Sequence, residues 1–175
     1  LTTLLDDQAP VTTKTYGEPN EARLIEVPSC DGDVLVNGHL ITTDTTITLD
    51  AVDNISGVDE TFVAVLVPVG CEDGDEVEYV GLIDHNIYPG TEEGFFTCVE
   101  NNNNEEEGCV ATFWDIKVDE ELGENPFVYD NPFVIPQEST HKICFFSVDE
   151  AGNEEEIQCQ VALVDDSAPT INSAE

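Results

Sequence analysis

The chain has 175 residues, and its 39 Asp and Glu residues stand against only 4 Lys and Arg, so its formal net charge at pH 7 is −35. This balance excludes nucleic acid and anionic membrane surfaces as partners, because so few cations cannot offset phosphate repulsion. Hydrophobic residues make up 40% of the chain, too many for a disordered acidic tail. No stretch of about 18 apolar residues occurs, so no direct membrane insertion is expected. These limits favour a folded, acidic domain with a core of its own.

A short motif recurs near the two ends of the chain: Asp6-Asp7-Gln8-Ala9-Pro10 returns as Asp165-Asp166-Ser167-Ala168-Pro169. A repeat of this kind marks a tandem array or a head-to-tail assembly, so we interpret both copies as linkers. The expected organisation is the end of a preceding repeat and a linker over 1–10, one domain over 11–164, and a linker with the start of the next repeat over 165–175. The apolar run Leu1–Leu5 is either the tail of a preceding repeat's last strand or a donor strand that inserts into a neighbouring subunit.

Between the linkers, the segments are typical of β-strands. Thr45–Val52 alternates with period two and is rich in β-branched residues. Phe62–Val67 is continuously apolar, like a strand covered on both faces, and Thr112–Val118 alternates again. The clearest hairpin joins Lys142–Val148 to Ile157–Val164 across the turn Glu150-Ala151-Gly152-Asn153. No segment keeps a helical apolar period over several turns, so the sequence predicts an all-β fold, a sandwich.

Cysteine usage indicates disulfides. The chain has 6 cysteines, and an even number without a Cys-x-x-Cys pair favours disulfides and an extracellular setting over a zinc or redox site. If the hairpin turn is centred between Ala151 and Gly152, Cys144 and Cys159 become cross-strand neighbours within bonding range. The other expected pairs are Cys98–Cys109, which would close the loop Asn101–Gly108, and Cys30–Cys71.

Two stretches of the chain resemble the immunoglobulin-like repeats of large bacterial and archaeal cell-surface proteins. The first comprises Ala9–Thr13 and Thr45–Val58, and the second comprises Asn131–Pro136, His141 and Phe146–Glu154. In those repeats a strand ending in Asp, a Ser-Gly-Val turn and a closing Ser-Val-Asp-x-Ala-Gly-Asn hairpin follow in this order. The resemblance implies an immunoglobulin-like β-sandwich, an extracellular location at the cell surface, and a structural position for His141.

The chain departs from this family pattern in its middle. Residues 59–110 intervene between the Ser-Gly-Val turn and the strand around Phe113, and they include Cys71, Cys98 and Cys109. We therefore expect a disulfide-stapled insertion. Such an insertion is the part of a common scaffold best suited to contact a cell-surface glycan or a partner cell.

Two loops share a sequence pattern that suggests a metal site. Val52–Gly57 and Val148–Asn153 each place Asp directly after a strand and Gly a few residues later. In a sandwich both loops can lie at one end, close to an Asp-Asp linker, and clustered carboxylates suit Ca²⁺, which takes six to eight oxygen ligands. The candidate calcium ligands are Asp53, Asp149, Asp165, Asp166, Asp6 and Asp7.

Two alternatives to a calcium site stay open. In one, Asp and Asn merely start turns and Gly supplies a positive φ. In the other, the acidic surface is an adaptation to high salt, where screening removes self-repulsion. The sequon Asn54-Ile55-Ser56 is a candidate glycosylation site, which agrees with an extracellular chain.

Catalytic motifs do not emerge from the sequence. It has no Gly-x-Ser-x-Gly elbow, P-loop or dinucleotide fingerprint, and its three histidines lack metal-ligand spacing. We therefore expect a non-enzymatic structural or adhesive repeat of an extracellular filament, stalk or surface layer, whose partners are neighbouring copies of the same domain or subunit. The alternatives are a carbohydrate- or cell-recognition module that uses the insertion, and a strand-exchanged subunit of a pilus-like fibre.

Overall fold

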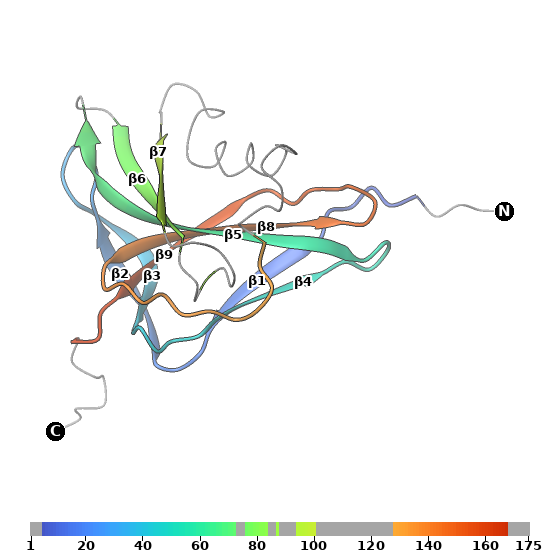
Figure 1. Cartoon of the computed structure of the whole chain (residues 1–175), viewed down its shortest axis with the longest axis horizontal. Coiled ribbons are helices and arrows are strands. Elements are labelled where there is room, and N and C mark those ends of the chain that lie inside the picture. Colours follow the sequence, from blue (N-terminus) through green and yellow to red (C-terminus); the bar gives the residue numbers. More distant parts are fainter. Residues whose placement is uncertain (1–4, 73–75, 84–86, 88–93, 101–127, 168–175) are drawn as a thin grey trace.

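The computed structural model describes residues 5–72, 76–83, 87, 94–100 and 128–167. Within this part the regular structure is entirely β (Figure 1). The strands are β1 (Val11–Tyr16), β2 (Asn20–Val27), β3 (Val34–Ile41), β4 (Ile47–Val52), β5 (Val58–Glu72), β6 (Glu76–Ile83), β7 (Gly94–Glu100), β8 (Thr140–Asp149) and β9 (Gln158–Val164). They form a two-stranded sheet, β1-β4, and a seven-stranded sheet in the order β2-β3-β9-β8-β5-β6-β7. The predicted all-β, sandwich-like arrangement is confirmed. Among the described residues no helix suitable for crossing a membrane is found.

The centre of the large sheet carries most of the core. β5 and β8 are antiparallel, from the pair Val58↔Asp149 to the pair Leu66↔Lys142. Residues Phe62–Leu66 are at most 2% exposed, and the rings of Phe62 and Phe146 stack with centroids 4.9 Å apart. A strand buried on both faces has an unbroken apolar sequence, so the prediction of a strand at Phe62–Val67 is confirmed. The strand extends beyond that run at both ends.

The small sheet packs its inner face on this core. β1 and β4 pair antiparallel, from Val11↔Val52 to Tyr16↔Ile47, and Ile47 and Leu49 belong to the buried cluster. The predicted start of the strand at Thr45 is wrong. Thr45 lies in a turn, where its amide donates to Thr42 O at 3.1 Å and its hydroxyl donates to Pro19 O at 2.6 Å. These bonds occupy its polar groups, so the strand begins at Ile47.

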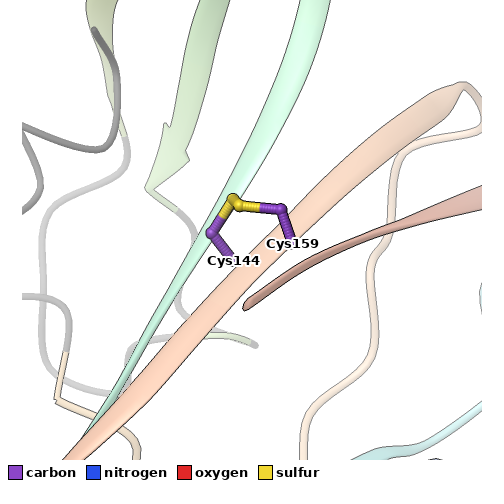
Figure 2. Close-up of a disulfide and its surroundings, with 2 residues drawn as sticks. All are labelled: Cys144 and Cys159. Carbon is purple, nitrogen blue, oxygen red and sulfur yellow. A yellow bond between two sulfur atoms is a disulfide. The ribbon is translucent and has the colours of Figure 1, made fainter. Parts of the chain in front are cut away.

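The β8–β9 hairpin has the predicted register. Thr140 pairs with Leu163 and Cys144 with Cys159, and the two cysteines form a disulfide between neighbouring strands (Figure 2). Gly152 in the connection has φ +90°, a conformation that glycine adopts without the steric penalty of a side chain. The predicted hairpin and its disulfide are therefore confirmed.

Other sequence-based expectations fall partly outside the described residues. Cys30 is disulfide-bonded, but the pairs Cys30–Cys71 and Cys98–Cys109 involve side chains that the structure does not describe. The predicted strand Thr112–Val118 and the loop Asn101–Gly108 also lie outside it. Of the expected insertion at residues 59–110, the described part forms most of β5 and all of β6 and β7, which build one side of the large sheet.

Candidate metal centre

Three carboxylates from distant parts of the chain converge at one end of the molecule. Asp6 precedes β1, Asp53 follows β4, and Asp149 is the last residue of β8. One carboxylate oxygen from each lies within 4.8 Å of the other two. Asp149 is only 1% exposed, whereas Asp6 and Asp53 are half-buried. We call these three residues the acidic cluster.

Asp53 is positioned by the turn that it starts. Its Oδ1 accepts hydrogen bonds from the backbone amides of Ile55 at 3.0 Å, Ser56 at 2.9 Å and Gly57 at 2.9 Å. Gly57 has φ +90°, which completes the turn. No described residue donates to Oδ2, so this oxygen is available to a ligand. The hydrogen-bonded turn that the sequence suggested is therefore present, but it uses only one of the two carboxylate oxygens of Asp53.

Asp149 is held by the loop that follows it. Its Oδ1 accepts from the amide of Asn153 at 2.8 Å, and its Oδ2 accepts from the Asn153 side-chain Nδ2 at 2.8 Å. The same Nδ2 donates to the backbone oxygen of Asp6 at 3.0 Å. The amide of Glu150 donates to Gly57 O at 2.9 Å, which joins the two loops to each other. Asn153 therefore couples the hairpin loop to the segment that precedes β1.

Asp6 brings the segment before β1 into the cluster. Its Oδ2 accepts from the Ser56 hydroxyl at 2.6 Å and from the Ser56 amide at 3.2 Å, and its Oδ1 accepts from the Gln8 amide at 3.0 Å. The Ser56 hydroxyl is the main reason that the pKa of Asp6 lies below its ordinary value, and the backbone amides of Gln8 and Ser56 contribute to the same effect. Asp6 is thus held as an anion beside two other carboxyl groups.

The acidic cluster offers the oxygen ligands that a hard cation prefers. Like charges at this separation disfavour one another's ionised form, and a bound cation reverses that effect. Ca²⁺ is bound by mixtures of carboxylate and backbone carbonyl oxygens. The three carboxylates fit that requirement, and the backbone oxygen of Asp6 lies beside them. Turn formation accounts for each loop separately, but it does not require the three carboxylates to meet.

The other predicted ligands are not in the cluster. Asp7 is exposed. Asp166 accepts from the amide of Thr43 at 2.8 Å and from its hydroxyl at 2.7 Å, and the Asp166 amide donates to Glu138 at 2.8 Å. Asp165 accepts from Ser167 at 2.9 Å and 2.7 Å. Because β8 separates Glu138 from Asp149, the two Asp-Asp motifs lie at opposite ends of this strand. Only the first motif contributes to the acidic cluster.

A polar network that the sequence did not reveal docks β1 beside the cluster. The two carboxylate oxygens of Glu155 accept from the Thr12 amide at 2.8 Å and the Thr12 hydroxyl at 2.5 Å. The second oxygen also accepts from the Ser147 amide at 3.1 Å. Thr12 is 3% exposed and Ser147 is fully buried. Glu155 therefore holds β1 in place through Thr12.

Two side chains in β1 have no polar partner among the described residues. Lys14 Nζ and Tyr16 Oη are buried there without a hydrogen bond from the described part of the chain, and Nζ lies 3.6 Å from the centroid of the Tyr16 ring. Burial lowers the pKa of Lys14 to about 7 and raises that of Tyr16. His39 stacks on Tyr16 with ring centroids 4.6 Å apart, and burial, followed by the charge of Lys14, lowers its pKa.

Of the remaining predicted positions, Asn54 is exposed in the loop after β4. His141 is fully buried, and its Nδ1 lies 2.9 Å from Ser139 O. Burial lowers the pKa of His141 to about 4.

Comparison with protein-family models, with curated proteins and with solved structures finds no match to this chain.

Proposed function

We propose that this chain is a non-enzymatic structural or adhesive repeat of an extracellular filament, stalk or surface layer, whose N-terminal linker is locked to the domain by calcium. The observation that carries the proposal is the position of Asp6, a linker residue that meets Asp53 and Asp149 from two loops of the domain. A linker held in this way fixes the direction in which a preceding domain or subunit is attached. A mechanical array needs such rigid joints, because unrestrained linkers leave domains free to move.

An immunoglobulin-like topology is part of the proposal. Its support is the strand order β9-β8-β5-β6-β7 within the large sheet. In variable-type immunoglobulin domains one sheet carries the last hairpin, strands G and F, followed by strands C, C′ and C″, which is the same spatial order. The resemblance of the loops at Asp53 and Asp149 to cell-surface repeats points in the same direction.

The extracellular setting rests on the cysteines and the sequon. Cys144 and Cys159 form a disulfide, Cys30 is disulfide-bonded, and disulfides persist mainly in oxidising compartments. Asn54 is exposed, so its sequon is accessible to a glycosylating enzyme.

The calcium lock is tested by thermal unfolding of the full chain in calcium and in EDTA at matched ionic strength. Binding to the native state alone stabilises by about 2.7 kcal/mol when free calcium is 100 times the dissociation constant. For a domain of this size, that corresponds to a rise in Tm of about 5–10 °C. Matching the ionic strength with NaCl separates calcium binding from the screening of surface charge.

Asp53→Asn and Asp50→Asn are the matched pair of variants. Asp53 offers its Oδ2 to the cluster, while Asp50 is exposed on β4, and each change removes one negative charge. We expect Asp53→Asn to lose most of the calcium-dependent rise and Asp50→Asn to keep it. Equal Tm values for the original chain in calcium and in EDTA would refute the calcium lock.

A further inference from the structure

The large sheet has an incomplete ladder between β3 and β9. Their parallel pairing covers only Gly38–Ile41 with Val161–Val164, although β3 begins at Val34 and β9 at Gln158. A groove of about 780 Å³ lies beside this junction, lined by residues of β2, β3 and β9 that include Leu24, Val36 and Val161. Unpaired strand edges of this kind are templates for an added strand.

Exposed apolar side chains lie on the strands that form the groove. Leu24 is 56% exposed and lines it, and Leu35 on β3 is 64% exposed. Val34, at the start of β3, is 45% exposed. Within the described residues, the remaining strongly exposed aliphatic side chains lie on the N-terminal linker, at the far ends of β1 and β4 and in the loop after β4. An apolar surface left open on an otherwise acidic domain marks a contact site.

The chain contains a segment of matching character. Leu1–Leu5 is uncharged, apolar and rich in strand-forming residues. Leu5 is 82% exposed, so its own domain does not cover it. Asp6 is anchored to Ser56 and Asn153, which holds the start of the domain in place. Leu5 is therefore exposed at the end of the domain that carries the acidic cluster.

The geometry prevents this segment from lying along the groove of its own copy. The linker enters β1 from one end of the long axis, whereas the β2–β3 hairpin lies toward the other end (Figure 1). The nearest groove residue on β9, Cys159, pairs with Cys144, five residues from the Asp149 end of β8, which is about 17 Å along the strand. Five extended residues also span about 17 Å, so their full length would be used to reach the groove and none would be left to lie in it. A partner for the groove must therefore come from a second copy.

Charge favours the same pairing. The groove is lined by Arg23, one of only 4 Lys and Arg in a chain of net charge −35. Arg23 lies 3.9 Å from Glu21, and both side chains are partly exposed. Asp7, which follows the incoming segment, is exposed. With 39 Asp and Glu in the chain, a surface that carries an arginine repels a second copy less than a purely acidic one.

We propose that Leu1–Leu5 of one copy adds as a strand in the groove beside β3 and β9 of a second copy, which makes a head-to-tail contact. The inference deepens the proposed structural role by naming the surface that joins neighbouring copies. Because the two contacting surfaces differ, the contact is heterologous and continues from copy to copy instead of closing a symmetric dimer.

The test is a complementation of two full-length variants in sedimentation velocity, in calcium and enough salt to screen the net charge. Leu24→Asp alters the groove and leaves the segment intact, whereas Leu4→Asp with Leu5→Asp does the reverse. We expect the original chain to form oligomers that grow with concentration and each variant to be monomeric. An equimolar mixture of the two variants should form dimers and nothing larger, because only one intact contact can form per pair.

Val11→Asp is the control, since it removes an aliphatic side chain that is 64% exposed and adds the same charge outside both surfaces. It should oligomerise like the original chain. If Leu24→Asp lowers the Tm, Val36→Asp replaces it as the groove variant, because Val36 also lines the groove. A monomeric original chain, a mixture without dimers, or a monomeric Val11→Asp chain would overturn the contact. None of these results affects the calcium dependence of the monomer's Tm, so failure of the contact and failure of the calcium lock are distinguishable.

Discussion

Cys144 and Cys159 face each other across the β8–β9 hairpin, with Cα atoms 4.1 Å apart and their sulfurs bonded. Cys144 is 1% exposed and lies in the core, whereas Cys159 is exposed. The disulfide therefore ties a central strand of the large sheet to the strand that leads into the second Asp-Asp motif.

Replacing both cysteines tests the contribution of this disulfide. The bonded residues are 15 apart in sequence, and closing a loop of that length restricts the unfolded chain by about 3 kcal/mol. We expect Cys144→Ala with Cys159→Ala to lower the free energy of unfolding by about 2–4 kcal/mol in urea titrations. Peptide mapping of the original chain without reduction should recover the Cys144–Cys159 pair, and recovery of Cys144 with another cysteine would contradict the assignment.

The Glu155 network makes β1 docking sensitive to one carboxylate. Glu155→Gln replaces an oxygen acceptor by an amide donor among the Thr12 and Ser147 groups, which leaves buried polar atoms unpaired. We expect a loss of about 1–3 kcal/mol in unfolding free energy. Glu156→Gln is the control, because Glu156 is exposed and its substitution removes the same charge. An equal effect of both substitutions would show that charge, not the network, determines the loss.

Gly38 is required by a close approach of two strands. A Cβ at this position would lie 2.5 Å from Val161 O and 2.8 Å from Ile25 Cγ1, and the first of these is backbone that cannot turn away. We expect Gly38→Ala to cost about 1–3 kcal/mol of stability through the overpacking of the β3–β9 junction. At Gly17 the nearest atom would lie at 3.5 Å, so Gly17→Ala should be close to neutral. Similar thermal unfolding of the two variants would contradict a steric requirement for glycine at position 38.

Lys14 should make stability depend on alkaline pH. Burial lowers its pKa from 10.5 to about 7, so between these values the unfolded chain holds a proton that the native chain has lost. Stability therefore rises with pH through this window. Below pH 7 the native state carries a buried charge to which no described residue offers a hydrogen bond, and Lys14→Met removes that cost.

We expect Lys14→Met to gain roughly 1–2 kcal/mol at pH 6, a value discounted because solvent still reaches part of the side chain. The gain should shrink as the pH rises from 7 to 10. Arg23→Met is the control, because Arg23 is half exposed and arginine keeps its charge throughout this range. A gain for Lys14→Met that does not change with pH would be inconsistent with a neutral Lys14 in the native protein.

Local features of the fold could be predicted from the sequence, whereas its long-range pairings could not. Gly152 and its neighbours define the β8–β9 turn, and a known turn fixes the register of both strands. Nothing in the periodicity of Phe62–Val67 shows that β5 lies beside β8, because alternation reports burial and not the identity of a partner strand. The parallel pairing of β3 with β9 is likewise a product of the tertiary fold.

The candidate site likewise combines local turns that the sequence predicts with a long-range contact that it does not predict. The turns that begin at Asp53 and Asp149 were predictable, since Asp followed by Gly is a local signal. Which Asp-Asp motif joins them was not predictable, because both motifs have nearly the same sequence. The choice depends on distant side chains: Thr43 and Glu138 engage Asp166, while Ser56 and Asn153 hold Asp6.

The most direct test of the calcium-locked linker is the backbone order parameter of Gln8, whose amide donates to Asp6 at 3.0 Å. We predict a value near 0.85 in calcium, as in a rigid strand, and a value below about 0.6 in EDTA at the same ionic strength. Asp53→Asn should leave Gln8 mobile in both buffers, while the order parameters of β5 and β8 stay high throughout. An order parameter at Gln8 that is the same in calcium and in EDTA, whether high or low, would contradict the account.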